Sequence, residues 1–258
     1  MVKKILSIVL WVATAAALVW LFVYAREDYL HTPLKAINLI PETDTGFVSK
    51  SALYKEIESF CKEFGRSKEI KAVDMIAVQE VMKNNAWIES STSYVDLDGV
   101  LNVSFKEYEP WFRVYGKNGR SVYVTRNGVV IPPSRIYTPY VLVASGNFEL
   151  RSDSVAYRLN DSLESDKNLL NALHWCGAIE GNDFVSHCVG QLYCNKKDLF
   201  EITVKGFDGR VIVGDTCDAA DKLNRLEVFM KQRIDSPETK NLKSINLNYK
   251  NQIVCTKR

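Results

Sequence analysis

Residues 89–107 read ESSTSYVDLDGVLNVSFKE and form the clearest structural pattern in this chain of 258 residues. Two runs of alternating side chains, 89–97 and 100–107, flank the dipeptide Asp98-Gly99. This dipeptide suits a type I′ turn, because both central positions of that turn need a positive φ. One face of the second run is apolar: Leu101, Val103 and Phe105. The stretch therefore predicts a β-hairpin with one buried face.

The residues before the hairpin predict one strand and two helices. Alternation indicates a strand at 35–40, and the region 47–64 is typical of a helix that ends at Gly65. Asp74 is a suitable N-cap for a second helix, whose apolar stripe comprises Met75, Val78, Val81 and Met82. Pro110 closes the unit after the hairpin. The order β-α-α-β-β predicts a two-layer α+β module over residues 35–110.

The pattern after Pro110 is mainly that of β-structure. We expect helices at 165–178 and after Asp218, and a tight turn at Asp208-Gly209. The expected strands are 112–115, 122–125, 129–131, 140–144, 184–194, 199–205, 210–213, 244–249 and 252–256. Residues 111–258 therefore predict a mainly antiparallel β domain with two flanking helices, and the fold class of the whole chain is α+β.

The N-terminus predicts a membrane anchor. Residues 5–25 read ILSIVLWVATAAALVWLFVYA and carry no charge, and a helix of that length spans roughly 31 Å, close to the hydrocarbon thickness of a bilayer. Lys3 and Lys4 precede the run, so the positive-inside rule places residues 1–4 in the cytoplasm. Residues 26–34 would then form a linker to an extracytoplasmic bulk. A cleaved signal peptide is the alternative, but cleavage within 13–17 would leave an apolar stub.

Composition and motifs favour a binding protein over an enzyme. Lysine and arginine number 33 and aspartate and glutamate 31, so the net charge of +2 provides no bulk attraction for nucleic acid. The sequence contains no Gly-x-Ser-x-Gly, Ser-x-x-Lys or His-Glu-x-x-His motif and no phosphate-binding glycine loop. The three histidines, His31, His174 and His187, are explained by packing or surface roles. We therefore expect no catalytic residue, no cofactor and no small-molecule substrate.

The six cysteines leave several possibilities open. An even number in an oxidising compartment is compatible with disulfides, but the sequence does not select a pairing. If residues 184–194 form one strand, Cys188 and Cys194 are about 20 Å apart, too far to bond directly. A zinc site built from Cys176, His187, Cys188 and Cys194 lacks any Cys-x-x-Cys pair. We expect no metal site.

Several short motifs in this order resemble the FtsQ/DivIB family of bacterial cell-division proteins. Residues 85–88, Asn-Ala-Trp-Ile, are similar to the family's Asn-Pro-Trp-Val, with Ala86 in place of proline. Residues 107–110, Glu-Tyr-Glu-Pro, are similar to its Glu-x-x-Pro, and residues 123–131 to the hairpin that opens its β domain. Near the end, residues 222–226 and 244–249 are similar to its last helix and strand, although Asn246 stands where aspartate is common.

The resemblance implies a division of the chain and a function. Residues 35–110 would be a POTRA domain and 111–258 the family's β domain, behind a single membrane helix at 5–25. The protein would be a non-enzymatic scaffold in the cytoplasmic membrane at the division septum. Its partners would be FtsB-like and FtsL-like bitopic proteins, which it would link to the septal peptidoglycan synthase pair FtsW and FtsI. The alternative is a membrane-tethered POTRA-type adaptor of another envelope assembly or secretion system.

The last strand is the predicted partner-binding site. A terminal strand leaves one row of backbone N–H and C=O groups unpaired, and a partner segment can add to that edge. The candidate residues are Tyr249, Asn251, Gln252, Ile253, Val254 and Cys255. Lys257 and Arg258 would add positive charge next to an acidic partner segment.

Overall fold

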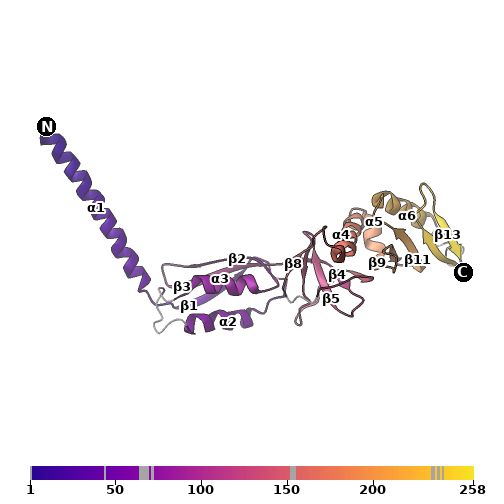
Figure 1. Cartoon of the computed structure of the whole chain (residues 1–258), viewed down its shortest axis with the longest axis horizontal. Coiled ribbons are helices and arrows are strands. Elements are labelled where there is room, and N and C mark those ends of the chain that lie inside the picture. The colour runs from indigo at the N-terminus through magenta and orange to yellow at the C-terminus, as the bar shows by residue number, and fades with distance from the viewer. Residues whose placement is uncertain are drawn as a thin grey trace. The chain divides into compact units, whose positions relative to one another are not determined.

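The computed structural model of the chain describes residues 2–43, 45–63, 70, 73–151, 155–233, 236, 239 and 241–258. The chain divides into two compact units, Met1–Glu107 and Tyr108–Arg258, which contain separate sheets (Figure 1). The predicted class is confirmed: an α+β protein with one N-terminal apolar helix and a large, mainly antiparallel sheet.

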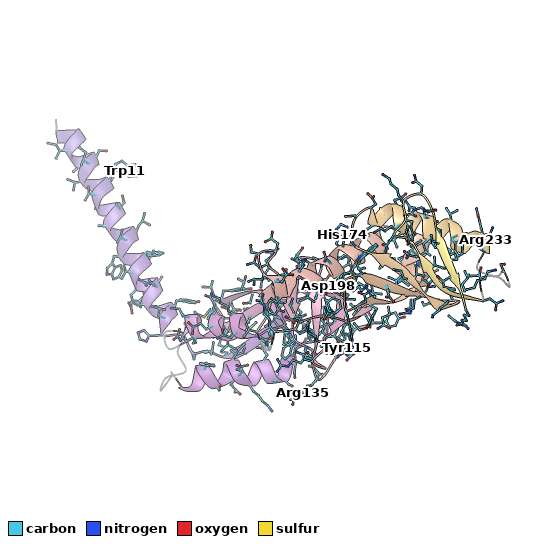
Figure 2. The ribbon with its side chains drawn as sticks, turned by 45° about the vertical axis from the view of Figure 1, so that its right-hand side comes forward. Trp11, Tyr115, Arg135, His174, Asp198 and Arg233 are labelled. Atoms are coloured by element: carbon cyan, nitrogen blue, oxygen red, sulfur yellow. The ribbon has the colours of Figure 1, made fainter. Side chains whose placement is uncertain are left out.

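Helix α1, Val2–Leu30, contains the candidate membrane span Ile5–Leu30. Its side chains from residue 5 to residue 28 are exposed, as the isolated sticks around Trp11 show (Figure 2). Trp20 and Tyr24 stack with their ring centroids 5.8 Å apart, near the end where aromatic rings favour a membrane interface. The helix continues past the apolar run, because residues 26–30 contain no helix-breaking residue.

The remainder of the first unit has the predicted order β-α-α-β-β. Its elements are β1 (Ala36–Pro41), α2 (Lys50–Glu63), α3 (Met75–Asn84), β2 (Ile88–Val95) and β3 (Val100–Glu107). The strand order is β1-β3-β2, with β1 parallel to β3 and β2 antiparallel to it. The predicted cap is also present, since the Asp74 carboxylate accepts the N–H groups of Ile76 and Ala77.

The core of this unit lies between the helices and one face of the sheet. Its fully buried members are the predicted apolar residues of β3 together with helix residues: Leu101, Val103, Phe105, Ile57, Val78 and Met82. Because successive strand residues alternate between faces, the period-two pattern of residues 101–105 determines which side of the hairpin meets the helices.

The hairpin turn differs from the predicted type I′. Of its residues only Gly99 has a positive φ, +83°, and Asp98 does not. The Gly99 N–H bonds to the Asp96 carbonyl, and the Asp96 N–H bonds to the Val100 carbonyl. This pattern is that of a three-residue loop whose last residue is left-handed. The Asp96 carboxylate stabilises it by accepting the N–H groups of Asp98 and Val100, which the prediction did not consider.

The second unit is built on a ten-stranded sheet of order β13-β12-β11-β10-β9-β7-β4-β5-β6-β8. Pairing is antiparallel except for β4–β7, β7–β9 and β11–β12, which are parallel. The strands are β4 (Pro110–Tyr115), β5 (Ser121–Thr125), β6 (Val129–Ile131), β7 (Leu142–Gly146), β8 (Tyr157–Arg158), β9 (Val189–Cys194), β10 (Phe200–Val204), β11 (Phe207–Gly214), β12 (Leu242–Asn246) and β13 (Val254–Lys257).

In the described part of this unit, three α-helices pack on one face of the sheet, where two were predicted. They are α4 (Lys167–Glu180), α5 (Asp183–Cys188) and α6 (Ala219–Arg233), and a short 3-10 helix, Glu164–Asp166, precedes α4. The shared core includes Phe112, Leu192, Val211, Trp175 and Leu226. Alternate strand residues such as Arg113, Tyr193 and Arg210 are absent from that core, so they belong to the opposite face of the sheet.

Two local predictions in this unit are wrong. Residues 184–194 are not one strand: Asn182 caps α5 by accepting the Val185 N–H, and only β9 is extended. The 20 Å separation inferred for Cys188 and Cys194 on a continuous strand therefore does not apply. Asp208-Gly209 lies inside β11, and the turn falls at residues 205–206, where Gly206 has a φ of +82°.

Candidate functional site

The candidate site is the end strand of the large sheet. Strand β13 pairs with β12 on one side, with Ile245 opposite Cys255 and Asn246 opposite Val254, and no other described strand pairs with it. Strand β13 is drawn in yellow near the C-terminus (Figure 1). All four of its residues are exposed, in contrast to the buried Ile245 beside them. The strand therefore offers an open backbone edge as well as exposed side chains.

Arg225 of α6 holds the connection between β12 and β13. Its guanidinium donates to the carbonyl oxygens of Leu247 (3.1 Å), Tyr249 (2.9 Å) and Gln252 (2.8 Å). Its Nε atom lies 2.9 Å from the Asp221 carboxylate, one turn earlier on the helix. The Arg225 side chain is only 18% exposed, so one planar cation organises three backbone acceptors at the point where the chain reverses into β13.

Gly214 and Asn248 determine how closely this connection approaches the sheet. Gly214 ends β11 with a φ of +71°, a conformation that glycine adopts without strain. A Cβ atom at this position would collide with the Asn248 side-chain amide. The Asn248 N–H in turn donates to the Asn246 side chain at 3.0 Å. The start of the connection is therefore packed directly against the end of β11.

The predicted site residues occupy two different parts of this hairpin. Val254 and Cys255 lie on β13, whereas Tyr249, Asn251 and Gln252 lie in the connection, and Asn251 has a φ of +58°. Ile253 is partly buried against the core. The predicted strand 252–256 thus becomes 254–257, because the left-handed Asn251 and the carbonyls bound by Arg225 delay the extended backbone. The sequence reasoning did not single out Thr256, which lies on the edge, or Arg225, which supports it.

The charged residues around the edge are all basic. The last twenty residues, 239–258, contain five basic residues and no acidic one: Lys240, Lys243, Lys250, Lys257 and Arg258. Of these, Lys243, Lys250, Lys257 and Arg258 are described as exposed. Lysine at an edge strand discourages self-association of identical sheets, and the same charge attracts a segment rich in aspartate or glutamate.

Burial suppresses the reactivity of two thiols in this unit. The described cysteines Cys176, Cys188, Cys194, Cys217 and Cys255 are all free. Burial raises the pKa of the Cys176 thiol, and it raises the pKa of Cys194 to about 11. A thiol is reactive only as the thiolate, so these two buried groups remain protonated at neutral pH. Among the described residues, no three histidine, cysteine or acidic side chains form a metal-binding group.

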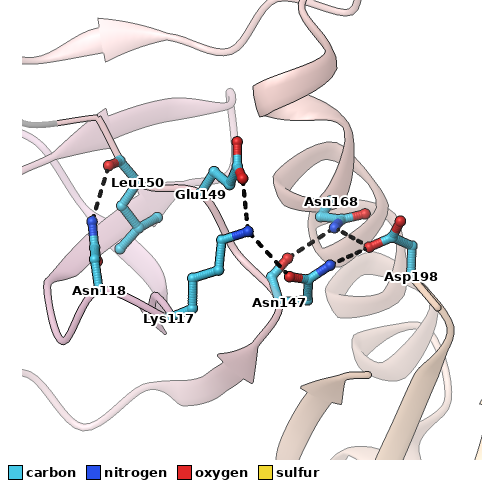
Figure 3. Close-up of polar contacts among 7 residues, drawn as sticks. All are labelled: Lys117, Asn118, Asn147, Glu149, Leu150, Asn168 and Asp198. Carbon is cyan, nitrogen blue, oxygen red and sulfur yellow. Dashed lines mark hydrogen bonds and ion pairs between the residues drawn. The ribbon is translucent and has the colours of Figure 1, made fainter. Parts of the chain in front are cut away.

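A polar cluster ties together three elements beside the β9–β10 turn (Figure 3). The Asp198 carboxylate accepts the side-chain amides of Asn147 and Asn168, both at 2.7 Å. Asn168, in the first turn of α4, also donates to the Asn147 carbonyl, and Lys117 bridges Asn147 and Glu149. These hydrogen bonds hold the pKa of Asp198 below its usual range, with Asn168 as the largest cause. The cluster therefore stabilises the packing of α4 against the loops that contain Asn147 and Asp198.

The sheet face opposite the helices carries aromatic and charged side chains. The Arg113 guanidinium lies 4.8 Å from the ring centroid of Tyr115, which Figure 2 labels, and 5.1 Å from that of Tyr123. Arg113 also donates to the Ser121 hydroxyl at 3.0 Å. A shallow depression further along this face is lined by Gln191, Tyr193, Glu201, Ile202, Thr203 and Arg210. These groups do not form a recognisable catalytic set, and the buried Nε atom of Arg113 has no hydrogen-bond partner among the described residues.

The fold and the edge define a class of protein: a chain with an N-terminal apolar helix and an α+β body whose large sheet ends in an exposed edge strand. The chain belongs to the FtsQ/DivIB family, because a sequence model described as FtsQ/DivIB, C-terminal related, matches residues 109–256. This match covers every described strand of the large sheet except for Lys257, the last residue of β13. No curated protein matches the chain. The family is one of cell-division proteins and of non-catalytic scaffolds, and together with the apolar helix it indicates a single-pass membrane protein.

Proposed function

We propose that this chain is a non-enzymatic scaffold of the bacterial division machinery. Helix α1 would anchor it in the cytoplasmic membrane, with the N-terminus inside and the residues that follow α1 on the extracytoplasmic side at the septum. FtsB-like and FtsL-like bitopic partners would bind the β13 edge. Through them the chain would be linked to septal peptidoglycan synthesis by FtsW and FtsI. Residues 35–110 would be a POTRA domain, a proposal supported by the β-α-α-β-β order of the elements from β1 to β3 and by the strand order β1-β3-β2.

The observation that carries this proposal is the open edge at β13. A β-strand whose outer N–H and C=O groups have no sheet partner binds another extended segment through main-chain hydrogen bonds. The basic residues around the edge favour an acidic segment, since complementary charge directs both encounter and register. The family of division scaffolds makes a protein partner the expected occupant.

The structure refines which of the predicted residues would meet the partner. Val254, Cys255 and Thr256 would supply the backbone edge, and Tyr249 and Gln252 would flank its beginning. Ile253 packs against the core, so it would position the strand instead of contacting the partner. Truncation after Asn248 would remove this packing as well as two carbonyls bound by Arg225. Substitution within β13 is therefore a more selective test.

Proline substitutions at adjacent positions test the edge. In an antiparallel pair, neighbouring residues direct their backbone hydrogen bonds to opposite sides of the strand, so Val254→Pro and Cys255→Pro remove N–H groups that face opposite ways. The full chain in lipid discs is titrated with the labelled extracytoplasmic segments of the same organism's FtsB–FtsL pair, and binding is followed by fluorescence anisotropy. Val254→Ala and Cys255→Ala are the matched controls, and circular dichroism monitors the fold.

One proline should separate β13 from β12 and lower the melting temperature. The other should leave the fold intact and weaken binding about tenfold or more, because one lost hydrogen bond and a steric clash together cost at least about 1.4 kcal/mol. Both alanine variants should bind almost normally. Normal binding by the folded proline variant would contradict the edge site. If the wild-type chain also failed to bind, the alternative role in another envelope assembly would be favoured.

A further inference from the structure

The turn between β2 and β3 is a rigid projection. The Asp96 carboxylate accepts the N–H groups of Asp98 (3.0 Å) and Val100 (2.8 Å) and the side-chain amide of Asn102 (3.1 Å). These bonds hold the pKa of Asp96 below its usual range, the Val100 N–H being the largest cause. Because its acceptors are engaged within the turn, Asp96 stabilises residues 96–100 in one conformation.

This turn is attached to the end of α1. The Tyr29 hydroxyl, in the last turn of α1, donates to the Val95 carbonyl at 2.9 Å, although 66 residues separate the two. The Lys35 N–H donates to the Gly99 carbonyl at 2.8 Å. Gly99 is also packed so tightly against the Pro33 carbonyl that a Cβ atom would collide with it. Contacts on both sides of the turn therefore hold it beside the chain that leaves α1.

The position of Tyr29 relates the turn to the bilayer. The uncharged run ends at residue 25, and Tyr29 lies about 6 Å further along the helix axis at 1.5 Å per residue. The polar layer on each side of a bilayer is about 5–8 Å thick. In addition, helical Cα–Cβ bonds tilt toward the N-terminus, so the Tyr29 ring leans toward the bilayer. The Val95 carbonyl, which accepts the Tyr29 hydroxyl, is therefore placed at the level of the headgroups.

Two exposed side chains next to Val95 and in the turn are large and hydrophobic or aromatic. Leu97, at the tip of the turn, is 86% exposed, and Tyr94 on β2 is 53% exposed. Among the described residues of the first unit that follow α1, no other large apolar side chain is as exposed as Leu97. Leucine at the headgroup boundary gains by leaving water, and tyrosine favours that boundary. The neighbouring Asp98 carboxylate is exposed and limits the depth, because it remains among the polar headgroups.

We propose that the turn 96–99 is a second membrane contact, with Leu97 inserted into the headgroup layer of the bilayer that α1 crosses. The proposal rests on α1 spanning that bilayer, as the proposed function requires. Two attachment points separated in sequence would restrict rotation of the three-stranded sheet and its helices about the α1 axis. The partner of this surface is a lipid surface, since the turn follows continuously from the membrane helix through the contacts of Tyr29 and Lys35.

Depth-dependent quenching tests this contact in the full chain. A polarity-sensitive fluorophore is attached at position 97 (Leu97→Cys), 90 (Ser90→Cys) or 22 (Phe22→Cys), in a background with Cys217→Ser and Cys255→Ser. The background alone measures residual labelling. Each protein is placed in lipid discs whose acyl chains are brominated near the headgroups. Ser90 is the matched control because it is exposed on the same hairpin but lies far from the turn. It pairs with Lys106, which is six residues beyond Val100.

The label at position 97 should lose roughly half of its emission and shift to the blue, as expected at the boundary of headgroups and acyl chains. The label at position 90 should remain unquenched and accessible to iodide. If the label at position 22 is quenched but the label at position 97 is quenched no more than the label at position 90, the proposed contact is overturned and the membrane anchor stands. Absence of quenching at 22 would overturn the anchor itself. Tyr29→Phe should reduce quenching at 97 but not at 22, and an unchanged signal would refute the role of that hydrogen bond.

Discussion

The Nη1 atom of Arg225 lies 2.9 Å from the carbonyl oxygen of Tyr249, which follows it by 24 residues. The same atom lies 2.8 Å from the Gln252 carbonyl. A helix residue thus determines where the chain turns before β13, and the proposed binding edge depends on a side chain outside it.

Replacing Arg225 with alanine should loosen β13. The change removes three charged donors and leaves the carbonyls of Leu247, Tyr249 and Gln252 without their partner. We expect a loss of about 1–2 kcal/mol in the free energy of unfolding. Amide hydrogen exchange of residues 254–257, measured by mass spectrometry, should become faster than the lower free energy of unfolding alone would make it.

Arg210→Gln is the control for removal of an arginine from the same unit. Arg210 is largely exposed and makes one ion pair, at 3.4 Å, with Glu201. The Glu201 side chain is only 11% exposed, but it also accepts the Asn195 side-chain amide, and a glutamine at position 210 can still donate to it. Arg210→Gln should therefore cost less than Arg225→Ala. Equal protection of residues 254–257 in the Arg225→Ala and Arg210→Gln variants would show that Arg225 does not support the edge.

Gly214→Ala should destabilise the second unit because it combines a strained φ with a collision. Gly119→Ala is the matched control: its φ of +75° is similar to the +71° of Gly214, but no atom lies near the added methyl group. The control should cost about 1 kcal/mol, and Gly214→Ala clearly more. Thermal denaturation of the two variants measures both losses of stability.

A second substitution separates collision from strain at Gly214. Asn248→Ala removes the amide that the new methyl group would meet. The double variant should therefore recover part of the lost melting temperature, leaving a cost like that of Gly119→Ala. Strict additivity of Gly214→Ala and Asn248→Ala would mean that the two residues do not interact.

Asp198→Asn should remove a pH-dependent contribution to stability. The pKa of Asp198 is lowered in the folded state, mainly by the Asn168 and Asn147 amides. A lowered folded pKa stabilises the protein above the unfolded value of about 3.9, and this stabilisation is lost as the pH falls through the folded pKa. Asparagine tolerates the positive φ at this position, so the substitution tests the carboxylate rather than the backbone.

Chemical denaturation at several pH values measures this effect. The wild-type chain should be more stable than Asp198→Asn at pH 7, and the difference should shrink below pH about 4. A difference that is constant from pH 7 to the acid limit would indicate that the carboxylate charge does not contribute.

Alkylation of cysteines should report the state of the β13 edge. Cys217 and Cys255 are exposed and should both react at pH 8. Cys255 should react more slowly than Cys217, because partial desolvation of its thiol raises the pKa of Cys255. Cys176 and Cys194 should react only after unfolding. Peptide mass spectrometry after timed quenching gives each rate.

A bound partner should slow alkylation of Cys255 and leave Cys217 unchanged. Cys255 lies on β13, whereas Cys217 precedes α6. Protection of both cysteines would indicate a broader contact than the strand edge, and protection of neither would contradict partner binding at β13.

Several features were predictable because they depend on neighbouring residues. Asp74 caps α3 as expected, since a cap needs only its own side chain and the next two or three N–H groups. The hairpin at 88–107 was also predicted from its alternation. Its turn type was not, because the Asp96 side chain and the neighbouring Pro33 favour a loop with one left-handed residue at Gly99.

The segment 184–194 shows where local pattern is insufficient. A short apolar run is compatible with a buried strand or a buried helix. Asn182 decides between them, because its side chain caps α5 while its amide donates to Asn224 and Glu227 of α6. That helix is more than forty residues away in sequence, and no local pattern indicates it.

The sequence by itself determined the N-terminal apolar helix, the order of elements in the first unit and the mainly β character of the second. These follow from apolar periodicity and from turn and cap residues, which act within a few positions of one another. Only the tertiary structure decided that β13 begins at Val254, that Arg225 supports it and that Tyr29 holds the Leu97 turn beside α1. Each of these depends on hydrogen bonds between residues about 20–70 positions apart, and such pairings form only when the packed core brings distant segments together.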